Sequence, residues 1–140
     1  MAEIEGLVRA LREGDDAAKT AAAGALRNLA WGNDANKAAI VEAGGIAPLV
    51  ELLRDGSAYG KYWAARALGN LALNNNANKV LIAQADGIAP FVELLRNGSW
   101  GGPGAHAAWA LDNLAHNNDA NAVARRDCSD AAPSPPAAAR

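Results

Sequence analysis

The feature that most constrains this chain is a repeat of its own sequence after 42 residues. Residues 25–57 read ALRNLAWGNDANKAAIVEAGGIAPLVELLRDGS, and 22 of these 33 positions are identical in residues 67–99. A third copy, ALDNLAHNNDAN, begins at residue 110, with one extra residue that we place in the glycine-rich stretch 97–106. The segment LVRALREG at 7–14 lies one period before LVELLRDG at 49–56. A period of this length indicates a solenoid, in which each unit packs against its neighbours.

Each unit predicts three helices. In the best-defined unit a short helix is expected at 76–85 and a second, with one apolar face, at 88–97. The third helices are expected at about 17–31, 59–73 and 104–116. We therefore predict an all-α solenoid of about two and a half to three repeats over residues 1–121, with units at approximately 4–33, 34–75 and 76–118.

Glycine and proline mark the helix ends. The pairs Gly44-Gly45 and Asp86-Gly87 follow the short helices, where glycine readily adopts the left-handed conformation that ends a helix. Pro90 falls early in the second helix, where its missing N–H removes no hydrogen bond. These positions support helix boundaries at the same place in each unit.

Composition and charge narrow the class of protein. The net charge of −2 is spread along the chain, so no basic stripe indicates nucleic-acid binding. No apolar run is long enough to span a membrane, and the N-terminal sequence does not resemble a secretion signal. The single cysteine, Cys128, cannot form an internal disulfide. We expect a cytoplasmic protein, with the nucleus as an alternative location.

The third helices carry a polar stripe with an Asn at the same place in each unit: Asn28, Asn70 and Asn113. Asn costs roughly 0.5 kcal/mol relative to Ala inside a helix, so its recurrence asks for a reason. The rest of the stripe is aromatic or basic: Trp31, Trp63, Arg66, His106 and Trp109. An amide can pair with both the N–H and the C=O of an extended backbone. Two alternatives remain open, namely that the Asn side chains bridge adjacent helices and that Trp63 and Trp109 serve only packing.

The motif AGGIAPLVELLRDGS followed by ALGNLA resembles the armadillo repeats of importin-α, β-catenin and vacuolar scaffolds, over roughly residues 4–121. The resemblance implies a right-handed superhelix of α-helices whose third helices bind an extended peptide. It assigns the peptide-backbone role to Asn28, Asn70 and Asn113 and a side-chain pocket to Trp109. The position of Trp109 is occupied by Gly24 and Arg66 in the earlier units, so we expect a peptide that is not strongly basic.

Nothing in the chain predicts catalysis or a cofactor. His106 and His116 have no Cys or carboxylate at metal-ligand spacing, and no nucleophile has a base at useful spacing. Glu51 and Glu93 occupy matching places on the second helices and are expected to be solvated. The sequence therefore predicts a non-enzymatic protein-binding scaffold.

Two further expectations concern the ends of the repeat array. The segment 122–140 is rich in Pro and Ala and is predicted to be disordered, although 118–126 could form a short helix. Leu and Val residues on the end helices are expected to be partly exposed, which favours self-association through the ends. The alternative function is thus a structural or self-associating module, or a piece of a longer armadillo array.

Overall fold

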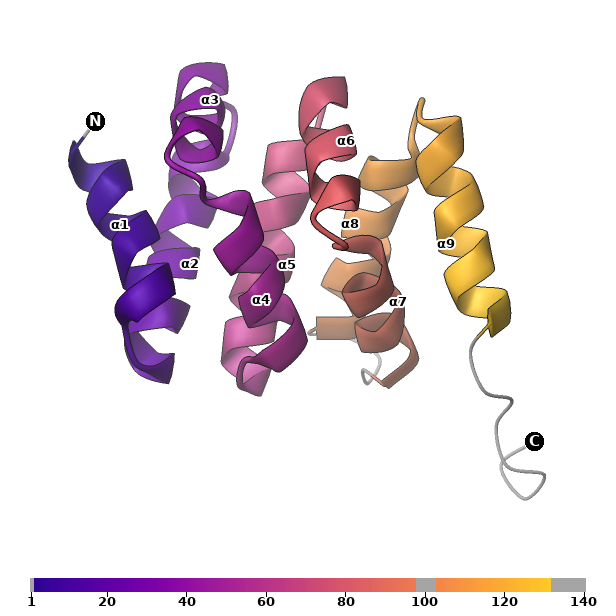
Figure 1. Ribbon diagram of the computed structural model, residues 1–140, viewed down its shortest axis with the longest axis horizontal. Helices are drawn as coiled ribbons and strands as arrows, with labels where there is room; N and C mark the ends of the chain where they lie inside the picture. The colour runs from indigo at the N-terminus through magenta and orange to yellow at the C-terminus, as the bar shows by residue number, and fades with distance from the viewer. Residues whose placement is uncertain (1, 98–102, 132–140) are drawn as a thin grey trace.

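The computed structural model describes residues 2–97 and 103–131, and these residues form a row of stacked helices (Figure 1). The helices are α1 (Ala2–Glu13), α2 (Asp16–Ala30), α3 (Asp34–Glu42), α4 (Ile46–Asp55), α5 (Ala58–Ala72), α6 (Asn76–Gln84), α7 (Ile88–Asn97), α8 (Pro103–Ala115) and α9 (Asp119–Ala131). The predicted all-α solenoid is confirmed. The predicted third helices begin and end within one residue of α2, α5 and α8.

The helices form layers that follow the sequence period. In Figure 1, α1, α4 and α7 lie in front of α2, α5 and α8, while α3 and α6 cross the upper end. Helix α5 packs between α2 and α8, and α9 packs against α7 and α8. The molecule therefore contains the last two helices of one unit, two complete three-helix units, and α9 at the place where a further first helix would stand.

The first helices begin at a repeated Asn cap. The side chains of Asn33, Asn75 and Asn118 accept hydrogen bonds from the backbone N–H three residues later, at 2.9 Å each. Such a cap satisfies one of the N–H groups that the first turn of a helix leaves unpaired. The residue before each cap has a positive φ, which allows the sharp turn out of the third helix.

The ends of the short helices differ from the prediction in one respect. The left-handed residues are Gly44, with φ 80°, and Asp86, with φ 64°, rather than the second residue of each pair. Gly87 is required for another reason, because a Cβ there would lie 2.7 Å from Cγ2 of Ile82. Gly87 thus allows the start of α7 to approach α6 closely.

The core runs through the centre of the row. Among the leucines of the third helices, Leu26, Leu68, Leu71, Leu111 and Leu114 are buried, and Leu29 is half-buried against them. Side chains of the first and second helices complete the core, including Ile40, Leu49, Ile82 and Phe91, all of which are fully buried. This continuous core holds α2, α5 and α8 in a fixed order.

The two ends of the row depart from the expected picture. In α1, Ile4, Val8 and Leu11 are buried, and the predicted partial exposure applies only to the half-buried Leu7. At the other end, α9 continues to Ala131, five residues beyond the short helix that the sequence allowed at 118–126.

Helix α9 forms because it is capped by Asn118 and packed through Ala124 against the core, and because alanine favours helix. Val123 remains 45% exposed. Residues 132–140 lie outside the described part of the chain. No helix among the described residues is both long enough and apolar enough to span a membrane.

Candidate binding groove

Helices α2, α5 and α8 lie side by side and form a surface that we call the third-helix groove. Two clefts open on it. The first, of about 560 Å³, lies between α2 and the start of α5 and is lined by Asp16, Ala17, Thr20, Ala21, Gly24, Asn28, Ser57, Tyr59 and Trp63. The second, of about 370 Å³, is lined by Arg27, Trp31, Arg66, Asn70, Ala105, His106 and Trp109. The groove therefore gathers seven of the eight predicted site residues, and only Asn113 lines neither cleft.

Asn70 and Asn113 connect neighbouring third helices. The Nδ2 of Asn70 donates to the carbonyl oxygen of Arg27 at 3.0 Å, and that of Asn113 donates to the carbonyl oxygen of Gly69 at 3.3 Å. Asn70 is only 2% exposed. The structure thus gives these two side chains the bridging role that the sequence left as an alternative, and a peptide-contacting role for them stays a prediction.

Asn28 occupies the same place in α2 but a different environment. Its side chain is exposed and accepts a hydrogen bond from Nη1 of Arg27 at 2.8 Å. No third helix precedes α2 in the described chain, so no neighbouring carbonyl accepts from this amide. Asn28 therefore presents its amide to the first cleft.

Trp63 and Trp109 each lie across a glycine of the preceding third helix. A Cβ on Gly69 would lie 2.8 Å from Cε3 of Trp109, whereas a Cβ on Gly24 would lie 3.6 Å from Cδ2 of Trp63. Trp109 and Trp63 are partly buried against the core. The two rings therefore both pack the helices together and form walls of the clefts, which combines the two roles considered from the sequence.

Arg66 is held by aromatic side chains. Its Nη1 donates to the hydroxyl of Tyr62 at 3.0 Å, and its guanidinium lies 5.1 Å from the ring centre of Trp63. The Tyr62 ring meets the rings of Trp63 and His106 edge-on, at 5.0 and 4.9 Å between centres. Tyr62 was missed in the sequence, although its position beside Trp63 in KYWAAR was a signal.

His106 is neutral in this setting at neutral pH. Burial lowers its pKa, and the positive charges of Arg66 and Arg27 lower the pKa further. A neutral imidazole has one donor and one acceptor nitrogen and adds no charge to the second cleft.

Two more residues line the second cleft, namely Trp31, which was identified in the sequence, and Arg27, which was not. Trp31, 59% exposed, follows the end of α2 and lines the second cleft. Arg27 also lines this cleft and was missed, because nothing in its repeat position distinguishes it from a solvated surface arginine.

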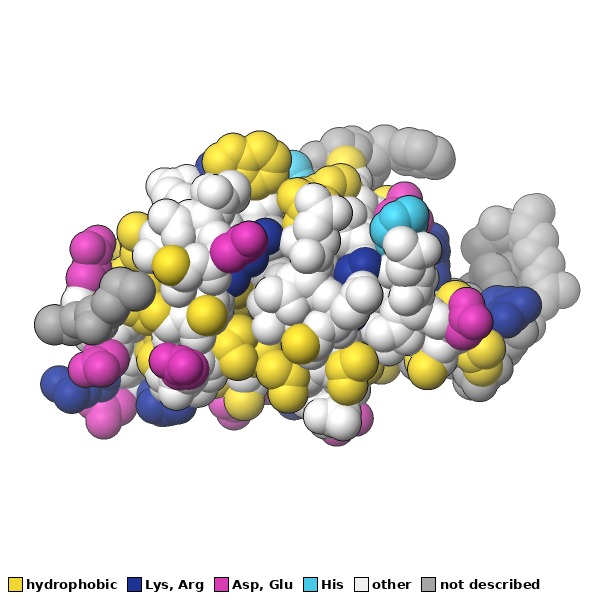
Figure 2. Space-filling view, turned by 90° about the horizontal axis from the view of Figure 1, so that it is seen from above, with side chains coloured by type: hydrophobic (Ala, Val, Ile, Leu, Met, Phe, Trp, Pro, Cys, Tyr) yellow, Lys and Arg dark blue, Asp and Glu magenta, His cyan; other side chains and the backbone are white. Residues whose placement is uncertain are grey.

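A second set of polar residues was also missed in the sequence. These residues lie at the corners, where the C-terminal ends of the third helices meet the first helices, and they hydrogen-bond the two together. Lys37 Nζ donates to the carbonyl oxygen of Leu73 at 2.9 Å, and Lys79 Nζ donates to that of His116 at 2.6 Å. Both lysines are buried, and burial lowers the pKa of Lys79. Figure 2 looks onto these corners and shows Lys or Arg side chains recessed between the helix ends. The repeated Asn-Lys pair in NDANK and NNNANK was the signal that could have identified them.

The Asn that precedes each of these lysines closes the same corners. Asn36, Asn78 and the equivalent Asn121 donate to backbone carbonyls seven residues earlier, at 2.9, 2.9 and 3.0 Å. Carbonyl groups at helix C-termini lack intrahelical partners, so these side chains satisfy groups that would otherwise be unpaired.

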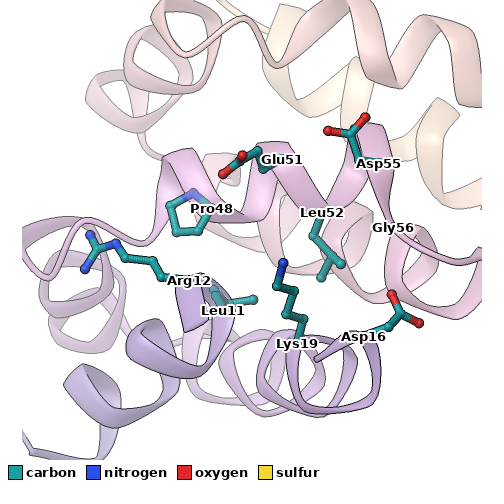
Figure 3. A pocket seen from close by; sticks show the side chains of 9 residues that line it. All are labelled: Leu11, Arg12, Asp16, Lys19, Pro48, Glu51, Leu52, Asp55 and Gly56. Atoms are coloured by element: carbon teal, nitrogen blue, oxygen red, sulfur yellow. The ribbon is translucent and has the colours of Figure 1, made fainter. Parts of the chain in front are cut away.

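A third pocket, outside the groove, lies between α1, α2 and α4 (Figure 3). The side chains of Lys19, Glu51 and Asp55 border it, and Arg12 donates to the carbonyl oxygens of Ala43 and Gly44. An equivalent pocket recurs one period later around Arg54, Lys61, Pro90, Glu93 and Leu94. These pockets therefore arise from the stacking of units. Glu51 and Glu93 are exposed, as predicted.

The described residues contain no group of three or more His, Cys, Asp or Glu side chains placed to hold a metal ion.

Comparison with known proteins agrees with the stacked three-helix units. The model of the Armadillo/beta-catenin-like repeat matches residues 33–73. An engineered protein of the Northeast Structural Genomics Consortium superposes with a TM-score of 0.84 at 34% identity, over 91% of this chain and 51% of that one. No match is found among curated proteins.

Two designed armadillo repeat proteins are also similar in structure. One is in complex with the peptide (KR)4 and has a TM-score of 0.80 and 29% identity, over 89% of this chain and 52% of that one. The other was designed for modular peptide recognition and has a TM-score of 0.81 and 28% identity, over 89% of this chain and 52% of that one. The chain spans about half the length of these structures. The fold is that of an armadillo-type solenoid, and residues 33–73 match an armadillo repeat.

Proposed function

We propose that this protein is a non-enzymatic scaffold that binds an extended segment of a partner protein along the third-helix groove. The observation that carries the proposal is the pair of clefts at successive positions along α2, α5 and α8, both walled by aromatic side chains. Neighbouring helices in such a stack lie about 10 Å apart, so a bound segment must be elongated to reach both clefts. The designed armadillo repeat protein in complex with (KR)4 supports this mode of binding.

We expect the aromatic and Asn side chains of the groove to have different roles in binding. Trp31 and Tyr59 are 59% and 75% exposed and offer large rigid surfaces at the edges of the clefts. The exposed Asn28 is the amide that we expect to meet the ligand backbone through its Nδ2, and the half-buried Asn113, whose Nδ2 is bonded to α5, is expected to offer only its oxygen. Asn70, whose Nδ2 is already bonded to α2, sets the position of α5 under the ligand.

The test uses a displayed library of random peptides, followed by affinity measurements on the peptides that the wild-type protein selects. Replacing Trp31 or Tyr59 by Ala is expected to weaken binding about tenfold or more, as for aromatic hot spots of protein interfaces. Val80→Ala and Leu81→Ala serve as matched controls, because these side chains are 43% and 38% exposed on α6, outside both clefts. Equal effects of the groove and control substitutions would contradict the proposal.

The same preparation tests the alternative of self-association. Sedimentation velocity is measured for the wild-type chain and for a chain that ends before α9. Concentration-dependent assembly that the truncation abolishes, together with no selected peptide, would favour a self-associating module over a peptide scaffold.

A further inference from the structure

The second cleft contains two positively charged side chains and no acidic side chain. Arg27 and Arg66 line it together with Trp31, Asn70, Ala105, His106 and Trp109. The ion pairs of the described chain, Lys37–Asp34 and Arg125–Asp112, involve neither arginine. The lining of the cleft is therefore cationic, with aromatic walls.

Both guanidinium groups keep N–H donors that no described residue accepts from. Arg66 donates through Nη1 to the Tyr62 hydroxyl and is otherwise held by stacking on the rings of Tyr62 and Trp63. Arg27 donates through Nη1 to Asn28, while its Nε is buried without a hydrogen-bond partner. The Nε of Arg27 is shielded from solvent, so the donors of this side chain that remain for a ligand are the other N–H groups of Nη1 and Nη2. Each arginine can therefore donate from its Nη groups to a further oxygen atom of a ligand.

The charges converge on one place. Burial lowers the pKa of His106, and the positive charges of Arg66 and Arg27 lower it further; His106 lines the same cleft from α8. Because His106 stays neutral at neutral pH, it can hydrogen-bond an anionic group without a proton being added first.

We propose that this cationic cleft binds the carboxylate of an Asp or Glu side chain on the extended segment, so that the partner carries an acidic residue at this position. The inference rests on the proposed function and specifies its ligand. The guanidinium group pairs with a carboxylate in a two-pronged geometry, and the indole rings of Trp31 and Trp109 can cover the aliphatic stem. A strongly basic segment would instead place like charges beside Arg27 and Arg66.

The experiment takes the peptides selected by the wild-type protein and remakes each in three forms, with Glu, Gln or Lys at the anchor position found by scanning substitution. The Glu form is expected to bind at least about tenfold more tightly than the Gln form at low salt, and this advantage shrinks at high ionic strength because salt screens charge pairs. The Lys form is expected to bind most weakly.

Variants of the protein locate the effect. Arg66→Gln and Arg27→Gln should each reduce the ratio of Glu-form to Gln-form affinity, and Arg66→Glu should reverse the preference in favour of the Lys form. Arg9→Gln is the matched control. Arg9 is exposed on α1, outside the cleft, and its substitution by Gln removes the same charge from the molecule. Circular dichroism confirms the fold of each variant. Where an arginine variant fails to fold, Arg66→Lys or Arg27→Lys replaces it, and the Lys variant should also reduce the ratio, because Lys keeps the charge but cannot form the two-pronged pair.

The outcomes separate this inference from the function on which it rests. Peptides that lose affinity with Trp31→Ala but bind equally in Glu and Gln forms would overturn the acidic subsite and leave the groove intact. Glu preference that survives both arginine substitutions would also overturn it. A protein that selects no peptide would overturn the proposed function and this inference together.

Discussion

At the scale of single residues, Asn has two different roles at equivalent positions of the repeat. Asn70 is buried and donates to the carbonyl of Arg27, whereas Asn28 is exposed on the first helix of the groove. The sequence identified both as unusual helix residues that must have a reason. It could not show which way their amides point, because the acceptor belongs to a helix 43 residues away, and packing alone brings that helix close.

The bridging role leads to a prediction about stability. Asn70→Ala removes a buried hydrogen bond and leaves a carbonyl of α2 unpaired, so it should lower the free energy of unfolding by about 1–3 kcal/mol. Asn28→Ala should change it by less than about 0.5 kcal/mol, because that side chain is exposed and Ala favours helix. Urea denaturation of the two variants measures the difference. Similar small effects of both changes would show that the Asn70 bond contributes little.

At the scale of helices, the boundaries were predictable and the fit between helices was not. The caps at Asn33, Asn75 and Asn118 act within three residues, so their signal is local and visible in the sequence. The packing of Trp109 on Gly69 joins α8 to α5 and depends on how closely the two helices approach. Helix α9 was underestimated for the same reason, because its contacts with α7 and α8 are not local.

The glycine contacts give a matched pair of substitutions. Gly69→Ala places a Cβ against the Trp109 ring, and we expect overpacking to cost about 1–3 kcal/mol. Gly24→Ala meets Trp63 at ordinary contact distance and should instead stabilise the protein, by up to about 1 kcal/mol, through helix propensity. Thermal unfolding shows whether each substitution raises or lowers the stability, and near-ultraviolet circular dichroism reports whether the indole of Trp109 or Trp63 moves. If both substitutions stabilise the protein, the Trp109 ring must shift to admit the new methyl group without loss of stability.

At the scale of the whole molecule, stability is expected to be a sum over neighbouring units, since each unit contacts only the next. Within each unit, a corner lysine ties the first helix to the end of the third, because Lys37 of α3 reaches the end of α5 and Lys79 of α6 reaches the end of α8. Cations near helix C-termini also interact favourably with the helix dipole.

Hydrogen exchange can show which helices the corner lysine bonds stabilise. Lys79→Met should speed amide exchange mainly in α8 and α9, and Lys37→Met mainly in α5 and its neighbours, since each removes a bond to one corner. Exchange measured by mass spectrometry on the same fragments of both variants provides the comparison. A uniform loss of protection along the chain in both variants would indicate that the array opens as one unit and would contradict nearest-neighbour coupling.

The Asn bonds between units and the Lys bonds that close the corners within units share a property that bears on how such a chain can evolve. Asn70, Asn113, Lys37 and Lys79 all donate to backbone carbonyls, and the residues that own those carbonyls differ: Arg27, Gly69, Leu73 and His116. Because every residue carries a carbonyl, these hydrogen bonds can form beside any neighbouring unit, whichever side chain the accepting residue carries. Gene duplication can therefore lengthen the array at once, while the groove positions remain free to diverge, as Gly24, Arg66 and Trp109 have done.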